Sequence, residues 1–304
     1  MIIQFPGKIN DRIKILGTPF IPIYLIKGES YALIEGGIKA LYPLVKKQLE
    51  GDRVNPDEIS NLILLHSHID HTGIAFPFNK YFPKTRVCAS EETAKAILKE
   101  EISPLIKKME EATERFLEIN IKESRTELDS VPNIAKTDKI LKDGDEIFLG
   151  NGITIRFLST PGHSNCSMSA YIPEQKALFI SDSAGLPVSA KMTFPMIFGN
   201  FRNFVSTCEK LSNIDADIIC FGHFLALTGK DTKGIFLKIR DEAIRMKEII
   251  LEKYAEYKDI GTVIDFMEKI YNKGYVKQLS YVFYEGSARA IIKILLKENG
   301  MLAG

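Results

Sequence analysis

The sequence has few cysteines and no long hydrophobic run. Its 304 residues include four cysteines, Cys88, Cys166, Cys208 and Cys220, and none is spaced as CxxC. This pattern indicates reduced, buried thiols rather than a disulfide framework or a thiolate metal site. No stretch approaches the roughly 18 apolar residues of a membrane span, and the N-terminal segment lacks the apolar core of a signal peptide. We therefore expect a cytoplasmic protein that does not cross a membrane.

An excess of one charge is also missing. Lys plus Arg (40) balances Asp plus Glu (39), which leaves a net charge of +1 and argues against a nucleic-acid partner. The hydrophobic fraction of 45% and the charged fraction of 26% are typical of globular proteins. At this length the chain can form one large domain with an appended part, or two modest domains.

Hydrophobic periodicity predicts two successive groups of strands, a helical insertion and a helical tail. Strands are expected up to residue 35, at 61–65, 85–90, 139–181 and 216–222. Helices are expected at 39–50, in the insertion at 91–123, at 201–212 and from 230 onward. This order predicts an α/β fold of two face-to-face sheets with helices outside. We divide the chain into a catalytic domain at 1–230 and a helical cap at 231–304.

A short segment that follows an apolar run contains most of the histidines. The stretch "LILLHSHIDHTG" at 62–73 holds three of the five histidines in the chain. Alternate side chains of an extended segment point the same way, so His66 and His68 can converge on one ion. Asp70 and His71 are adjacent and can face a second position. One loop can therefore begin two metal sites.

Three further candidate ligands each follow an apolar strand: His163, Asp182 and His223. A single histidine at a strand end is most often a hydrogen-bonded or surface residue, and a single aspartate there is often a turn residue. Here every histidine of the chain falls in the cluster or at a strand end, which favours a metal site. Imidazole and carboxylate ligands suit zinc, iron or manganese.

The HxHxDH pattern at 66–71, with His163, Asp182 and His223 downstream, resembles the metallo-β-lactamase-fold hydrolase superfamily over roughly residues 10–230. The resemblance implies a four-layer αβ/βα sandwich of two mixed sheets with a metal centre at one edge. It implies two divalent metal ions, zinc foremost, with iron or manganese as alternatives. It also implies the ligands: His66, His68 and His163 for the first ion, Asp70, His71 and His223 for the second, and Asp182 for both.

The variable positions discriminate among branches of this superfamily. The flavin-linked diiron branch usually has Glu where His68 stands and carries a flavodoxin domain afterwards, and the sequence shows neither. The antibiotic-hydrolysing branch is exported, and its best-known members have Cys where Asp182 stands. The segments 15–38, 91–123 and 284–298 resemble the subgroup of the quinolone-signal response protein, an aminobenzoylacetyl-coenzyme A thioesterase.

The ligand set predicts a hydrolase that uses a hydroxide bridging two metal ions, and the resemblance implies a small-molecule thioester or related carboxylic ester as its substrate. Asp70 would steer the hydroxide or accept its proton. The aromatic residues Phe194, Phe198, Phe201, Tyr281, Phe283 and Tyr284 are candidates for an apolar pocket or for core packing.

Two alternative functions stay open. One is a phosphodiesterase acting on a small phosphodiester or on nucleic acid. The other is a metal-binding regulatory protein that acts through partner contacts. A homo-oligomer paired through the amphipathic segment 232–257 is an alternative to a helix that covers the protein's own site.

Overall fold

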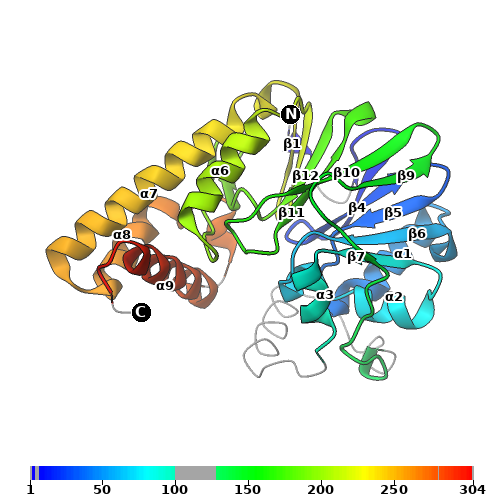
Figure 1. The fold of residues 1–304 in the computed structure, drawn as a ribbon, viewed down its shortest axis with the longest axis horizontal. Coiled ribbons are helices and arrows are strands. Elements are labelled where there is room, and N and C mark those ends of the chain that lie inside the picture. Colours follow the sequence, from blue (N-terminus) through cyan, green and yellow to red (C-terminus); the bar gives the residue numbers. More distant parts are fainter. Residues whose placement is uncertain (1, 4–6, 100–127, 280, 303–304) are drawn as a thin grey trace.

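Two seven-stranded sheets lie face to face in the computed structural model, which describes residues 2–3, 7–99, 128–279 and 281–302 (Figure 1). The first sheet has the order β2 (Gly7–Lys8), β3 (Ile13–Gly17), β4 (Pro22–Lys27), β5 (Tyr31–Ile34), β6 (Ile59–Leu64), β7 (Arg86–Ala89) and β8 (Lys139–Ile140). The second has the order β1 (Ile2–Ile3), β16 (Ala226–Thr228), β15 (Ile218–Phe221), β12 (Ala177–Ser181), β11 (Met168–Ile172), β10 (Ile153–Ser159) and β9 (Glu146–Gly150). Both sheets combine parallel and antiparallel pairs, as predicted.

The central strands are apolar on both faces because both faces are buried. Along β6, Ile63 belongs to the core between the sheets, whereas Leu62 and Leu64 belong to the core under the helices. Along β12, Phe179 and Ile180 divide in the same way. Such continuous apolar runs are typical of strands with helices on one face and a second sheet on the other.

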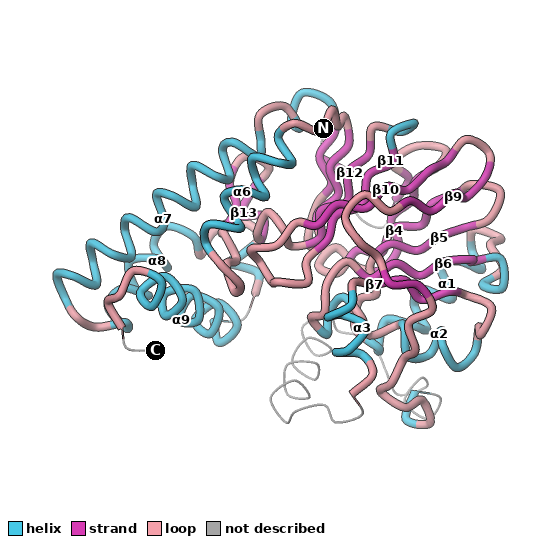
Figure 2. Tube along the Cα trace, in the orientation of Figure 1, coloured by secondary structure: helices cyan, strands magenta, loops and turns pink. Residues whose placement is uncertain are grey.

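Helices cover the outer faces. Figure 2 shows α1 (Tyr42–Gly51), α2 (Ala75–Tyr81) and α3 (Glu91–Ile97) beside the first sheet, while α6 (Phe201–Ser212), α7 (Ile235–Tyr257), α8 (Ile260–Tyr271) and α9 (Tyr281–Glu298) gather at the other side. The predicted helical tail from residue 230 is confirmed as α7 to α9. The predicted insertion at 91–123 begins with α3, and its part from residue 100 lies outside the described residues. Within the described chain, no helix combines the length and the apolarity needed to cross a bilayer.

The segment 139–150 was predicted as strand throughout, but it divides between the two sheets. β8 pairs in parallel with β7 of the first sheet, whereas β9 pairs with β10 of the second. Between them the chain turns at Lys142, whose backbone N–H donates to the Asp145 carboxylate at 2.9 Å. A hairpin of β13 (Leu186–Ser189) and β14 (Met192–Phe194) was not predicted.

The end of the last helix is tied to the start of α6. Asn200 caps α6, because its side chain accepts from the backbone N–H of Asn203 at 2.9 Å. The Glu298 carboxylate at the end of α9 accepts from the Asn200 side chain at 2.8 Å and from the Phe201 N–H at 3.2 Å. The two helices are thus joined next to the 195–200 segment, which reaches the functional site.

Candidate metal centre

Five strands end at one edge of the two-sheet sandwich, and each is followed by a side chain of the site. β5 and β6 are parallel neighbours in the first sheet, and β12 and β15 are parallel neighbours in the second. β10 runs in the direction of β12, because β11 lies between them and is antiparallel to both. The residues that follow these strands, directly or after a short loop, are Glu35, His66, Asp182, His223 and His163.

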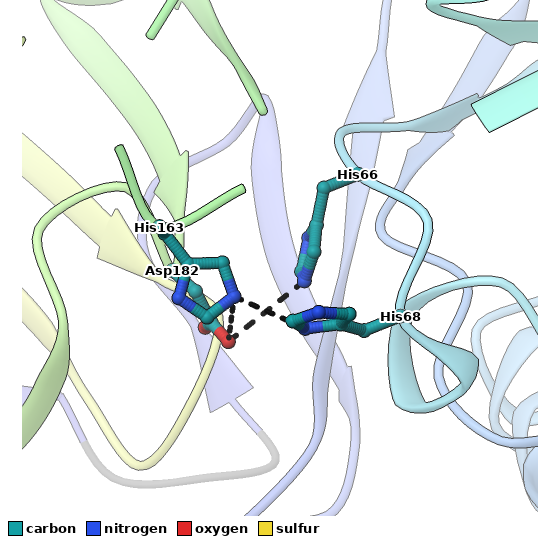
Figure 3. Close-up of side chains that lie close together, drawn as sticks. All are labelled: His66, His68, His163 and Asp182. Atoms are coloured by element: carbon teal, nitrogen blue, oxygen red, sulfur yellow. Dashed lines mark hydrogen bonds and ion pairs between the residues drawn. The ribbon is translucent and has the colours of Figure 1, made fainter. Parts of the chain in front are cut away.

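Two groups of side chains present atoms that can ligate a metal, which we call donors, and one carboxylate oxygen lies at the centre of the first group. Asp182 Oδ2 is 3.9 Å from His66 Nε2 and 3.5 Å from His163 Nε2. His68 completes the group through Nδ1, which lies 3.1 Å from His163 Nε2. Figure 3 shows His66 and His68 extending from one loop towards His163 and Asp182 on the opposite side. The ligand atoms of these four residues lie within 4.8 Å of one another.

The same oxygen faces a second group. Asp182 Oδ2 is 3.5 Å from His71 Nε2 and 3.6 Å from His223 Nε2. Asp70 Oδ2 lies 3.7 Å from His71 Nε2 and 3.6 Å from His223 Nε2. Two sets of donors therefore meet at Asp182, and all seven predicted side chains lie in one cluster.

Hydrogen bonds at the opposite ring nitrogen fix four of the histidines. The Nδ1 atoms of His163 and His223 donate to the carbonyl oxygens of Met196 (2.8 Å) and Phe20 (2.7 Å). A carbonyl only accepts, so each of these rings carries its proton on Nδ1. The other two contacts are His71 Nδ1 to Glu35 Oε2 at 2.6 Å and His66 Nδ1 to Ser181 Oγ at 3.0 Å.

The other ring nitrogens face one another across the cluster. The Nε2 atoms of His71 and His223 are 3.3 Å apart, although both rings are engaged at Nδ1. His66 Nε2 and Asp182 Oδ1 are buried and have no hydrogen-bond partner among the described residues. Donor atoms around a tetrahedral zinc ion lie about 3.3 Å apart. The residues present therefore fit bound cations, and the cluster is consistent with a dinuclear metal site.

Some histidines of the cluster have a lowered pKa, and others have a raised pKa. Burial lowers the pKa of His163 to about 4 and holds the pKa of His66 well below its usual value. Burial also acts to lower the pKa of His71, but neighbouring carboxylates, Asp182 foremost, outweigh it and raise that pKa well above its usual value. Burial acts to raise the pKa of Asp182, but His223 and His71 outweigh it, so that pKa is well below its usual value.

Sequence reasoning missed two residues that shape the site. Glu35 is 1% exposed, has φ of 78° and accepts from His71. Glu35 also lies near His66. Its Oε2 contacts Nδ1 of His71, which is on the opposite side of that ring from the Nε2 atom that faces the cluster. Gly222 allows the backbone to pass close to the site, because a Cβ there would lie 2.5 Å from Asp182 Oδ1. Glu35 could have been predicted as a site residue, because it directly follows β5, the strand that pairs in parallel with β6.

The predicted aromatic pocket divides into different environments. The half-buried Phe198 lies beside the first group of donors, with its ring centroid 5.3 Å from that of His163 and 6.1 Å from that of His68. Phe194 and Tyr284 are buried and pack against each other at 5.5 Å. Core packing therefore accounts for these two residues, whereas Phe198 adjoins the donors.

The other three aromatic candidates do not contact the donors in any described interaction. The Phe201 ring is covered by the Lys247 ammonium at 4.6 Å, and Tyr281 is 51% exposed on α9. Phe283 is half-buried against the helical core.

The sequence model of the Metallo-beta-lactamase superfamily matches residues 16–223. Among solved structures, the chain is similar to the metallo-beta-lactamase family protein TTHA1429 from Thermus thermophilus, with a TM-score of 0.68, 18% identity and coverage of 96% of this chain and 95% of that one. It is also similar to BJP-1, a subclass B3 metallo-beta-lactamase of Bradyrhizobium japonicum, with a TM-score of 0.59, 18% identity and coverage of 84% and 97%. These similarities confirm the predicted fold of two mixed sheets with C-terminal helices.

Curated relatives match a shorter part of the chain. The putative diflavin flavoprotein A 2 of Nostoc sp. is 24% identical over 172 residues, which are 56% of this chain and 24% of that protein. The metallo-beta-lactamase fold-containing protein ST1585 of Sulfurisphaera tokodaii is 25% identical over 171 residues, 55% of this chain and 61% of that protein. The chain thus spans about a quarter of the length of the first and less than two thirds of the second.

Proposed function

This chain belongs to the metallo-beta-lactamase superfamily, and from that membership we propose that it is a dinuclear metal-dependent hydrolase that cleaves a thioester or related carboxylic ester of a small molecule. The convergence of side chains from three other segments of the chain on one oxygen of Asp182 carries the proposal. We expect metal analysis of the purified protein to find two ions per chain, zinc foremost, with iron and manganese as alternatives.

The two groups of donors define which residues would hold each ion. The first ion would be held by His66, His68 and His163 and the second by Asp70, His71 and His223. Asp182 would hold both, because its Oδ2 also faces His71 and His223. Two bound divalent cations supply an activated water and a Lewis acid for an ester carbonyl. The bonds at Nδ1 fix both rings, so that in the neutral form of His163 and His223 the lone pair lies on Nε2, the nitrogen that faces the cluster.

Asp70 is the residue we propose for proton transfer. Its side chain is 23% exposed, whereas that of Asp182 is 6% exposed. Asp70 thus lies at the rim of the cluster, where a carboxylate can orient water or accept its proton. Asp182 lies inside, where its oxygen meets both donor groups.

The ring of Phe198 supports an apolar acyl group in the substrate. It is half-buried and adjoins two histidines of the first donor group. An apolar wall beside a few polar groups is typical of small-molecule sites. The balanced net charge of +1 supports a small molecule over nucleic acid. The resemblance to the aminobenzoylacetyl-coenzyme A thioesterase subgroup points the same way.

The test compares three substrate classes on protein loaded with zinc, iron or manganese. An acyl-coenzyme A, a nitrophenyl ester and bis-nitrophenyl phosphate are assayed in parallel with the wild type and with Asp182→Asn. We expect thioester turnover to exceed phosphodiester turnover and to fall by at least about 100-fold in the variant, because Asp182 serves both ions. Phosphodiester turnover well above thioester turnover would overturn the choice of substrate class. Equal activity in Asp182→Asn would overturn the metal mechanism.

A further inference from the structure

Ser181 adopts a backbone conformation that a serine rarely adopts. It is the last residue of β12, directly precedes Asp182 and has φ of 48°, in the left-handed region. The strand register is irregular between Phe179 and Ser181, where the chain turns towards the donor cluster. A residue with a Cβ is strained in this conformation, whereas glycine adopts it freely. The turn alone would therefore favour glycine at this position.

The side chain of Ser181 makes a contact that glycine could not make. Its Oγ lies 3.0 Å from Nδ1 of His66, and both residues are at most 2% exposed. On the other side of the ring, His66 Nε2 lies 3.9 Å from Asp182 Oδ2 and has no hydrogen-bond partner among the described residues. An Nδ1 proton bonded to Ser181 would leave the Nε2 lone pair directed at the centre.

We propose that Ser181 is a positioning residue for the first metal position, because its hydroxyl accepts the Nδ1–H of His66 and so holds the ring in the orientation that presents Nε2 to a cation. The strained backbone is the cost of placing this hydroxyl next to the ligand. Glu35, which also has a positive φ, makes the corresponding contact to His71 in the second group. The inference rests on the proposed dinuclear site, but it concerns a residue outside the set of seven.

The test uses Ser181→Gly and Ser181→Ala with Zn²⁺ alone as the probe. Both variants lose the hydroxyl, but only glycine also relieves the backbone strain. Ser183→Ala is the matched control, because Ser183 is also fully buried and its hydroxyl bonds Thr160 at 2.9 Å rather than a histidine. Zinc affinity is measured by competition with a chromophoric chelator. The tautomer of His66 is read in the metal-free protein by nitrogen-15 NMR.

We expect one of the two zinc affinities to fall about 10- to 100-fold in both Ser181 variants, as is usual when an outer partner of a metal-ligating histidine is lost. The other zinc affinity and both affinities of Ser183→Ala should match the wild type. The wild type should show His66 protonated on Nδ1, and the Ser181 variants should show a larger share protonated on Nε2. Metal-free Ser181→Gly should be at least as stable to denaturant as metal-free Ser181→Ala.

Three results would overturn the inference in distinguishable ways. Wild-type zinc affinities in both Ser181 variants, with two zinc ions bound to the wild type, would remove the positioning role and leave the proposed function intact. A serine with a structural role alone would lower the stability of the variants without changing zinc affinity or the His66 tautomer. A wild type that binds no zinc, iron or manganese would overturn the proposed function together with this inference.

Discussion

Replacing Gly222 by alanine should weaken zinc binding at the metal centre. The new Cβ would lie 2.5 Å from Asp182 Oδ1 and 2.9 Å from His71 Cε1. Carbon atoms in contact lie about 3.5 Å or more apart, so the imidazole would have to move by at least about 0.6 Å. Metal sites tolerate ligand displacements of only about 0.2 Å. We therefore expect zinc affinity to fall at least about tenfold, which is about 1.4 kcal/mol of binding free energy.

The assay is a competition titration of zinc against a chromophoric chelator, with thermal unfolding of the metal-free protein as the control for folding. Gly286→Ala is the matched variant, because Gly286 lies on the exposed face of α9 and a Cβ there meets no atom within 4 Å. It should bind zinc as the wild type does and gain up to about 1 kcal/mol of stability from helix propensity. Two zinc ions bound to Gly222→Ala with wild-type affinity would refute the steric reasoning.

Three further predictions concern buried polar groups. Glu35→Gln keeps an acceptor for His71 but loses its charge, so we expect zinc affinity to fall about tenfold, measured by the same titration. Tyr271→Phe removes a hydroxyl that donates to Glu242 at 2.5 Å, and denaturant unfolding should show a loss of about 1 to 3 kcal/mol with zinc binding unchanged. Burial raises the pKa of Cys208 to about 12, so mass spectrometry should find it unmodified by iodoacetamide in the native protein at pH 8 and modified after unfolding.

The fold could be predicted to the level of its layers because its strands are unbroken apolar runs between polar turns. Residues 61–65 and 216–222 were expected as strands, and the structure has β6 and β15 there. The assignment of β8 and β9 to different sheets could not be predicted. Both flank one turn, and the turn residues do not determine which distant strand each will pair with.

The side chains of the site could be predicted from the sequence, whereas the groups that fix their orientation could not. The five histidines of the cluster could be predicted, because they are all the histidines of the chain and each lies in the 66–71 segment or beyond a strand end. The atoms that fix these rings were not visible. The carbonyl of Phe20 that accepts from His223 is 203 positions away along the chain. Any residue can offer a backbone carbonyl, so no side-chain pattern marks Phe20 or Met196 for this role.

The hydrogen bond between Asn200 and Glu298 connects the C-terminal end of α9 to the segment that contacts the donor cluster. Four residues before Asn200, the carbonyl of Met196 accepts from His163. A truncation that removes the last turn of α9 would leave the cap of α6 without this support and loosen the loop that orients His163. For expression work, a fusion or affinity tag is therefore better given a flexible spacer than joined rigidly to the last helix.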